Sequence, residues 1–336
     1  MKSFEAPLFS PLSIAPMIDW SDTHFRVLMR LLAPKALLYT EMHTPNAIWH
    51  QPVRILQFHP AETPVALQLG GSDPETLAIA AKQGEEAGFS EINLNLGCPS
   101  SRVLAGKFGA CLMRDPSRVA RCITALKKAV SIPVTAKIRI GIDHDDSYEF
   151  FERFVKTLID AGCDKLIVHA RCAWLKGLNP KQNRTIPPLH YDYVYRIKAV
   201  VPTHIPVIIN GGINDIDAIQ AHLKILDGVM VGRLACSNPY AIATLHHALY
   251  PTISKPSRTE IFKHYLTYAA SQEVPLSILL KPILNLVHGL PHAGSFKQAL
   301  LQIKNLQNDL TIQAMSEKLT EMEQSLNGFS APILVH

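Results

Sequence analysis

Short apolar runs rich in β-branched residues recur along the first two thirds of the chain. Eight of them are separated by segments long enough for one helix each: SIAPMI, ALLYTEM, VALQLG, EINLNLGC, PVTAKIRIG, KLIVHAR, PVIINGG and GVMVGR. Most of the intervening segments are amphipathic, which is typical of surface helices. Strands that alternate with helices indicate a parallel sheet. The pattern therefore predicts eight strand–helix repeats.

Two of the intervening helices carry clear start signals. Asp73 and Pro74 precede ETLAIAAKQGEEAG, and Asp115 and Pro116 precede SRVARCITALKKAV. An aspartate side chain can accept hydrogen bonds from the free N–H groups of a first turn, and proline fits the first helical position. These pairs predict helices that begin close to residues 74 and 116.

The number of repeats distinguishes two fold classes. Eight repeats close naturally into a TIM (β/α)8 barrel, whereas a doubly wound sheet more often has about five or six strands and opens with a glycine-rich phosphate turn. No G-x-G-x-x-G follows the first strand. We therefore expect an α/β fold of the TIM-barrel class.

Beyond Leu249 the pattern changes to helical periodicity without strands. Pro251, Pro256 and the serine between them resemble a linker, and the segment from Ser257 to about Leu326 is predicted to be helical. A barrel of roughly 250 residues plus a small appendage would account for the 336 residues. We expect a barrel domain over residues 1–250 and an all-helical domain over residues 251–336.

Composition places the chain among folded proteins. Hydrophobic residues make up 47% of the chain and charged residues 18%, which allows a buried core and argues against disorder. The N-terminus has no secretory h-region, and no later apolar run approaches the length of a membrane span. These features predict a soluble cytoplasmic protein with no membrane partner.

The cysteines and the net charge add two expectations. Six cysteines are scattered without CxxC pairs, which argues against a disulfide framework and against a structural metal. The net charge of +5 suits a polyanionic partner only weakly, because many unrelated proteins are mildly basic. The segment from Arg171 to Arg184 is more informative, since it carries four cations and no acid.

In a TIM barrel, residues at the carboxyl ends of the strands form the active site. The residues that close the eight apolar runs are Met17, Asp19, Glu41, Gln68, Asn95, Cys98, Lys137, Arg139, His169, Arg171, Asn210, Gly211, Gly212, Gly232 and Arg233. Most of these polar types are costly to bury without a partner. They are the candidates for binding and catalysis.

The last two strands end in Asn210-Gly211-Gly212 and Gly232-Arg233. Barrels commonly hold a phosphate at this place through backbone N–H groups, and glycines allow close approach of an oxyanion. The alternative is that Asn-Gly-Gly is only a tight turn. The arginine on the neighbouring strand favours a phosphorylated ligand.

Lys137 lies among β-branched residues that predict a buried strand, so its ammonium needs an anionic or electron-rich partner. A reduced flavin could supply that negative charge, but so could a carboxylate such as Glu41 or Asp19. His169 closes its strand in the same way, and it is either a ligand-binding residue or a histidine satisfied by the core.

Cys98 follows Asn95 and Gly97 and precedes Pro99, so it lies where a strand ends and the chain turns away. This position predicts a thiol at the mouth of the barrel. Since no cysteine is close by and no histidine has a protease-type local spacing, Cys98 is interpreted as a proton donor rather than a nucleophile.

Seven of these motifs occur together in one known family. APM (15–17), LQLGG (67–71), NLNLGCPS (93–100), KIRIG (137–141), HAR (169–171), NGG (210–212) and VGR (231–233) resemble the tRNA-dihydrouridine synthases in order and spacing. Three further segments, DWSDTHFR (19–26), FGACLM (108–113) and AWLKGLNPKQNRTIPPL (173–189), look like the DusA branch, which modifies D-loop uridines.

The resemblance implies a site and a reaction. It implies reduction of D-loop uridines 20 and 20a of tRNA, with Cys98 as the acid and NADPH as the electron source. It also implies FMN held by Pro16, Met17, Gln68, Lys137, His169, Asn210, Gly211, Gly212, Gly232 and Arg233.

The resemblance further implies tRNA contacts at Asn95, Arg102 and Arg184. Basic residues of the helical segment, Lys297 among them, suit tRNA phosphates. Gly294 and Gln298 stand where related chains carry arginines, so the orientation of the tRNA can differ from that branch. No obligate protein partner is expected, and the chain is expected to be a monomer.

Two other functions account for part of the pattern. An FMN barrel that acts on a small molecule, similar to dihydroorotate dehydrogenase, would explain the phosphate motifs and Lys137, but it has no use for the basic segment Arg171 to Arg184. An inactive RNA-binding barrel would explain the basic surface, but it predicts no bound flavin.

Overall fold

The computed structural model describes residues 10–306 and 309–328. Their contacts divide the chain into two compact units. The barrel unit contains the described residues of Met1–Ser21 together with Ala36–Gly232, and the helical unit contains Asp22–Lys35 and the described residues of Arg233–His336. The short segment Asp22–Lys35 therefore belongs with residues that follow it much later in the sequence.

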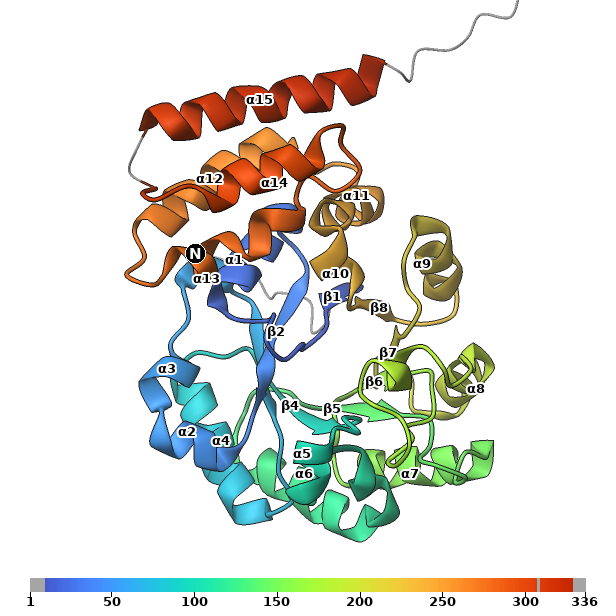
Figure 1. Cartoon of the computed structure of the whole chain (residues 1–336). Helices are drawn as coiled ribbons and strands as arrows, with labels where there is room; N and C mark the ends of the chain where they lie inside the picture. The colour runs from blue at the N-terminus through green and yellow to red at the C-terminus, as the bar shows by residue number, and fades with distance from the viewer. Residues whose placement is uncertain (1–9, 307–308, 329–336) are drawn as a thin grey trace, which may run out of the picture. The chain divides into compact units, whose positions relative to one another are not determined.

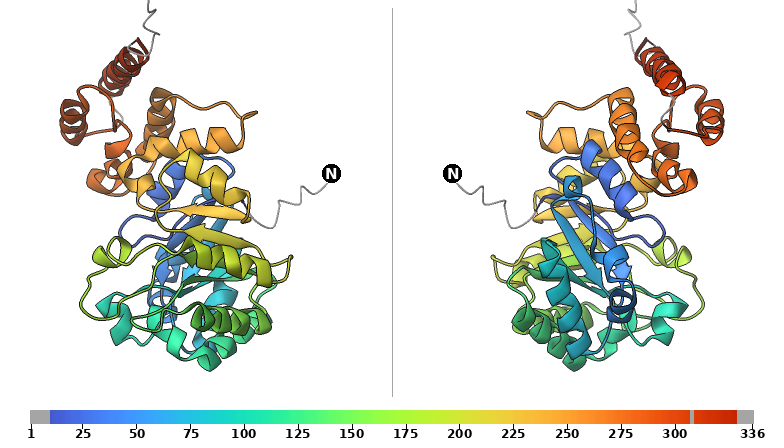
Figure 2. Two further views of the ribbon diagram at one scale, coloured as in Figure 1. Left: turned by 90° about the vertical axis from the view of Figure 1, so that its right-hand side faces the viewer. Right: turned by 90° about the vertical axis from the view of Figure 1, so that its left-hand side faces the viewer.

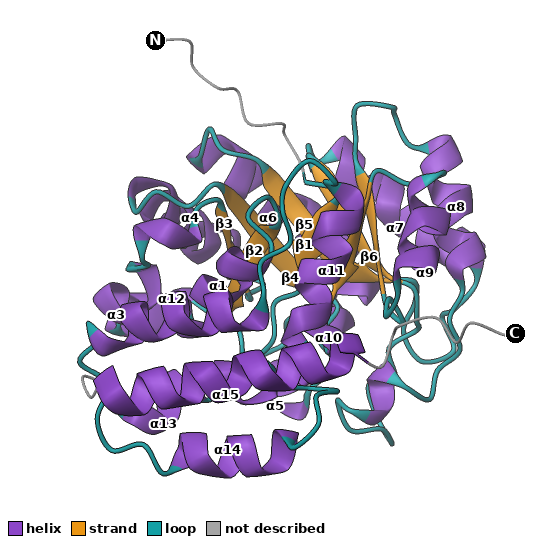
Figure 3. Ribbon diagram, turned by 90° about the horizontal axis from the view of Figure 1, so that it is seen from above, coloured by secondary structure: helices purple, strands orange, loops and turns teal. Residues whose placement is uncertain are grey.

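The barrel unit is a closed barrel of parallel strands in sequential order, and the strands run inside a ring of helices (Figures 1 and 3). Each of the eight predicted runs forms one strand, which confirms the TIM barrel. The strands are β1 Leu12–Ile14, β2 Leu37–His43, β3 Val65–Leu69, β4 Glu91–Leu96, β5 Val134–Arg139, β6 Lys165–His169, β7 Val207–Asn210 and β8 Gly228–Val231.

The helices that alternate with the strands lie on the outside of the barrel in both side views (Figure 2). They are α2 Pro45–His50, α3 Pro52–Leu56, α4 Pro74–Glu86, α5 Ser101–Ala105, α6 Pro116–Ala129, α7 Tyr148–Asp160, α8 Tyr191–Val200 and α9 Ile216–Leu223, with 3-10 turns η1 Pro60–Glu62, η2 Gly109–Arg114 and η3 Gln182–Arg184. The predicted starts of α4 and α6 are confirmed, because Asp73 and Asp115 accept hydrogen bonds from first-turn N–H groups.

The interior of the barrel has an apolar part and a polar part. The apolar cluster consists of Ala15, Leu37, Tyr39, Ala66, Ile167, Ile208 and Met230. The polar part is formed by side chains of β3 to β6, which are hydrogen-bonded to one another as buried polar groups must be. The polar part leads toward the carboxyl ends of the strands, where the candidate residues lie.

The helical unit contains no strand among its described residues, as expected for the C-terminal segment. Its elements are α1 Thr23–Leu32, α10 Leu234–Ser237, α11 Pro239–Leu249, α12 Arg258–Ala270, α13 Leu276–Leu280, η4 Pro282–Asn285, α14 Ala293–Leu301 and α15 Asp309–Gly328. Helix α1 packs against α11 and α12 of the same unit. No helix among the described residues is both long enough and apolar enough to span a membrane.

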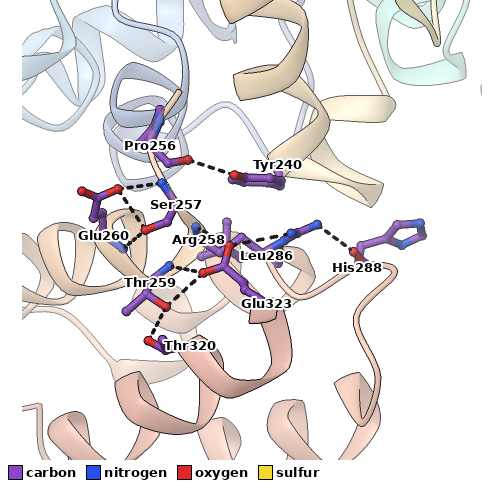
Figure 4. Close-up of polar contacts among 10 residues, drawn as sticks. All are labelled: Tyr240, Pro256, Ser257, Arg258, Thr259, Glu260, Leu286, His288, Thr320 and Glu323. Carbon is purple, nitrogen blue, oxygen red and sulfur yellow. Dashed lines mark hydrogen bonds and ion pairs between the residues drawn. The ribbon is translucent and has the colours of Figure 1, made fainter. Parts of the chain in front are cut away.

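A carboxylate of α15 caps the start of α12. Glu323 of α15 accepts hydrogen bonds from the backbone N–H groups of Arg258 (2.8 Å) and Thr259 (3.2 Å) at the start of α12 (Figure 4). The Arg258 side chain donates to the carbonyl oxygens of Leu286 and His288. Glu323 thus caps the free N–H groups of one helix from the surface of another.

Candidate active site

The loop after β4 carries Cys98 and is held by Asn95. The Asn95 side-chain oxygen accepts hydrogen bonds from the backbone N–H groups of Cys98 (3.0 Å) and Gly97 (3.2 Å). The Cys98 carbonyl accepts a bond from the Ala110 N–H (3.0 Å). The thiol itself is half-buried and lies 3.5 Å from the Ser100 hydroxyl oxygen. Both backbone groups of Cys98 are therefore fixed, and the residue is half-buried.

Two cations of β5 lie close enough to Cys98 to interact with it electrostatically. They are Lys137 and Arg139, and a negative charge on Cys98 would raise the pKa of each. Arg139 is buried and donates to the carbonyl oxygens of Gly97 (3.2 Å) and Asn183 (3.1 Å). Burial, more than any other cause, lowers the pKa of Arg139 to about 10.

Lys137 reaches across the barrel to β7. Its ammonium donates to the side-chain oxygen of Asn210 (3.0 Å), and among the described residues it has no carboxylate partner. Burial, followed by the charge of Arg139, lowers the pKa of Lys137 to about 7. An ammonium held by a neutral amide still lacks a counter-charge, so this site would favour an anionic or electron-rich ligand.

The turn after β7 requires glycine. Gly211 and Gly212 have φ angles of +107° and +72°, which L side chains rarely adopt. A Cβ on Gly211 would lie 2.6 Å from Cδ2 of His169. The Gly211 carbonyl accepts a bond from the Tyr191 hydroxyl (2.7 Å). The backbone here is thus fixed by neighbours that leave no space for a side chain.

His169 lies beside this turn and is buried. Burial, with the charges of Arg139 and Lys137, holds its pKa well below 6.5. The imidazole is therefore neutral at physiological pH, with one nitrogen that donates and one that accepts.

The remaining predicted residues of the barrel unit lie at the ends of other strands. Gln68 is buried and bonded to Asn93 and Asn95. Pro16 and Met17 follow β1, and Met17 packs against the apolar cluster. Gly232 follows β8, where a Cβ would come no closer than 3.8 Å to Ala15, so close packing does not require glycine there. Arg233 is exposed and falls in the helical unit.

The predicted tRNA contacts differ in how accessible they are. Arg102 on α5 and Arg184 on η3 are exposed, as a phosphate contact requires. Asn95 is buried, and its side chain is already engaged with Gln68 and with the Cys98 loop. Lys297 of the helical unit donates to the side-chain oxygen of Asn285 (2.8 Å).

Buried polar residues of β4 and β5 were not singled out from the sequence. Asn93 and Thr135 bond to each other and connect Gln68 to Glu91. The sequence does contain a signal for them, because polar residues 91, 93 and 95 alternate with apolar residues 92, 94 and 96. Period-two alternation places the three polar side chains on one face of a strand.

The solved structures with which the chain aligns share its fold. A complex of 2-naphthoyl-CoA reductase with 2-naphthoyl-CoA aligns with a TM-score of 0.55 at 9% identity, over 85% of this chain and 55% of that one. The 6-hydroxypseudooxynicotine amine oxidase of Pseudomonas geniculata N1 aligns with a TM-score of 0.53 at 11% identity, over 83% and 52%. The chain spans about half of each, so these likenesses concern the fold alone.

Sequence comparison gives a narrower result. The model of a family described as dihydrouridine synthase matches residues 13–324. The tRNA-dihydrouridine(20/20a) synthase of Synechocystis sp. is 50% identical over 89% of this chain and 91% of its own. The proteins of that name from Xanthomonas axonopodis pv. citri and Shewanella oneidensis are 50% and 49% identical, each over 86% of this chain and 87% of its own. The chain belongs to the dihydrouridine synthase family.

Proposed function

We propose that this protein reduces the C5–C6 bond of D-loop uridines 20 and 20a in tRNA, with FMN as the cofactor, NADPH as the electron donor and Cys98 as the proton donor. Membership of the family points to a flavin. The names of its relatives support the two uridine positions. The observation that carries the chemistry is a half-buried Cys98 on a fixed loop beside Lys137 and Arg139.

The residues at the carboxyl ends of β5 to β8 fit a phosphorylated flavin. The Lys137 ammonium lacks a counter-charge, His169 is neutral, and Gly211 admits no side chain. A half-buried cation suits an electron-rich ring, and glycine turns suit a phosphate. The residues proposed to hold FMN are Pro16, Met17, Gln68, Lys137, His169, Asn210, Gly211, Gly212, Gly232 and Arg233.

When bound, the reduced flavin supplies the hydride that is added at C6 of the uracil. Cys98 then gives its proton to C5: the S–H bond breaks, a C–H bond forms, and the thiolate regains a proton from water. The hydride brings both electrons, so the cysteine is neither oxidised nor reduced. Arg139 donates to the Gly97 carbonyl and so helps to hold the loop that carries Cys98.

The target base must leave its stack to reach a barrel mouth, which costs less in a loop than in a duplex. Arg102 and Arg184 are exposed and are proposed to contact tRNA phosphates. Asn95 is proposed to act near the base, and Lys297 and the C-terminal segment 251–336 are proposed to bind the tRNA backbone. Neutralising phosphates in this way would make binding depend on salt.

The test is dihydrouridine formation, measured by mass spectrometry after the purified protein is incubated with NADPH and unmodified tRNA. We expect the modified base at D-loop positions 20 and 20a, and a loss of turnover on the order of a hundredfold in Cys98→Ala. Cys111→Ala is the matched control, because Cys111 is also a half-buried free thiol of the barrel unit. Turnover of Cys98→Ala at the parent rate would exclude its role as the acid.

A further inference from the structure

A continuous line of buried hydrogen bonds connects an ion pair inside the barrel to the Cys98 loop. We call it the amide relay, and it consists of Lys165, Glu91, Thr135, Asn93, Gln68 and Asn95. All six residues are buried, with exposed fractions of 8% or less. The register places Gln68, Asn93, Thr135 and Lys165 side by side on neighbouring strands β3 to β6.

The direction of every bond in the first half is fixed by the ion pair. The Lys165 ammonium can only donate, and it pairs with the Glu91 carboxylate. That carboxylate also accepts bonds from the hydroxyls of Tyr39 (2.8 Å) and Thr135 (2.6 Å). Burial and the charge of Glu91 raise the pKa of Tyr39 well above 10, so its hydroxyl keeps its proton and donates.

The side-chain amides of Asn93 and Gln68 must donate in the same direction along the amide relay. The Thr135 hydroxyl has a single hydrogen, and it donates that hydrogen in its bond to Glu91. Its oxygen must therefore accept the bond from Asn93 Nδ2 (2.8 Å). The Asn93 oxygen therefore faces Gln68 and accepts from its Nε2 (2.7 Å). Each amide is left with a single orientation that satisfies both of its neighbours.

The other end of the amide relay imposes the same direction independently. The N–H groups of Gly97 and Cys98 can only donate, so Asn95 must present its oxygen to them. Its nitrogen then faces Gln68 and donates to Oε1 (2.8 Å). The two ends agree, and a reversed amide at any step would leave buried donors facing one another, which is costly.

We infer that Thr135 and Asn93 are positioning residues for Cys98, acting through the amide relay on the position of the Asn95 side chain and hence on the loop that presents the thiol. This inference rests on the proposed role of Cys98 as the proton donor. Neither residue is at the end of its strand, and the hydrogen bond of the thiol is to Ser100. A shift of the donor by about one ångström can cost up to a hundredfold in rate, so these residues should affect turnover from a distance.

A double-mutant cycle separates this role from simple packing. Thr135→Val keeps the shape but removes the hydroxyl, while Thr135→Ser keeps the hydroxyl. We expect Thr135→Val to slow single-turnover reduction of tRNA uridine on the order of tenfold in the parent enzyme. It should cause a clearly smaller loss in Cys98→Ala, because the thiol whose loop it positions is then absent. Thr135→Ser should restore most of the parent rate.

Two further measurements sharpen the result. The reduction of the bound flavin by NADPH does not use Cys98, so its rate in Thr135→Val measures any effect that reaches the flavin through Gln68. We expect this rate to fall by less than the rate of uridine reduction. Ser13→Ala is the matched control, since Ser13 is a buried hydroxyl of β1 that bonds to the Val229 carbonyl outside the amide relay. It should change neither rate.

The outcomes separate the inference from the proposed function. Equal losses from Thr135→Val with and without Cys98 would overturn the positioning role. A parent rate in Cys98→Ala would instead overturn the proposed acid, whatever Thr135→Val does. If Thr135→Val does not fold, Asn93→Ala enters the same cycle and breaks the amide relay one step closer to the loop, with the same expected dependence on Cys98.

Discussion

The ammonium of Lys137 on β5 lies 3.0 Å from the side-chain oxygen of Asn210 on β7, inside the barrel. Asn210 is held in turn by the Met230 carbonyl, which accepts from its nitrogen (2.8 Å). The contact satisfies one donor of the lysine but supplies no charge. Lys137 is therefore a cation whose stability in the fold depends on what else occupies the site.

Lys137→Met should change how the stability of the flavin-free protein depends on pH. The pKa of Lys137 is about 7 in the folded protein, below its ordinary value of 10.5, so folding of the parent releases a proton between these values. The free-energy cost of keeping Lys137 protonated in the folded protein is fully present below pH 7. It is relieved as the pH rises toward 10.5. At pH 6 the free energy of unfolding should be larger for the variant than for the parent. By pH 9 this difference should have decreased by a few kcal/mol, as an order of magnitude.

Denaturant unfolding at several pH values tests this expectation. Lys156→Met provides the control, because Lys156 is exposed on α7 and pairs with Glu152 at the surface. The control should show no comparable slope. A margin for Lys137→Met that stays constant between pH 6 and 9 would contradict the lowered pKa.

Gly211→Ala should destabilise the protein and reduce its flavin content. The substitution places a Cβ at a φ of +107° and 2.6 Å from His169, so backbone strain and steric overlap add to about 2–4 kcal/mol. Gly177→Ala separates the two effects, because Gly177 has a φ of +80° but no atom within 4 Å of the added Cβ. Thermal unfolding measures the loss of stability, and flavin absorbance per protein measures the loss of flavin. Equal effects of the two variants would mean that the contact with His169 does not matter.

Arg184→Ala should weaken tRNA binding in a way that depends on salt. Arg184 is exposed and close enough to Lys137, Arg139 and His169 to lower their pKa values. If it neutralises one phosphate, the slope of log affinity against log salt concentration should become less steep by about 0.7–0.9. Gel shifts at several salt concentrations measure the slope, with Arg121→Ala on the outer helix α6 as the control. An unchanged slope would remove Arg184 from the interface.

Glu323→Ala should destabilise the helical unit by about 2–3 kcal/mol. The carboxylate accepts from the N–H groups of Arg258 and Thr259, and its removal leaves these two groups without their partner (Figure 4). The Thr259 hydroxyl, which also donates to Glu323 (3.1 Å), keeps its bond to Thr320 (3.1 Å). Glu317→Ala is the control, since Glu317 is exposed on the same helix. Calorimetry should give a lower Tm for the first variant only. Matching Tm values would show that α15 does not depend on this cap.

The sequence predicts the barrel well because its signals are local. The apolar runs and the Asp-Pro helix starts each depend on a few neighbouring residues, and they determine the strands and the starts of α4 and α6. In a TIM barrel the active site lies at the carboxyl ends of the strands, which the parallel arrangement brings together. This leads to Cys98, Lys137, His169 and the Asn210 turn. Whether these residues hold FMN and uridine stays a prediction.

Other features depend on contacts that no local pattern contains. The Lys137 partner is Asn210 rather than Glu41 or Asp19, and that choice follows from the diameter and register of the barrel. The direction of the amide relay requires knowing which side chains meet across four strands. The grouping of Asp22–Lys35 with residues after Gly232 depends on packing between segments far apart in sequence.

That grouping has a consequence for synthesis of the protein on the ribosome. Helix α1 leaves the exit tunnel early, but α11 and α12, against which it packs, begin only at Pro239 and Arg258. At about 5–20 residues per second, α1 waits roughly ten to forty seconds for these partners. During that time α1 lacks the two helices against which it packs in the native structure. The helical unit of a nascent chain therefore stays incomplete until translation nears its end.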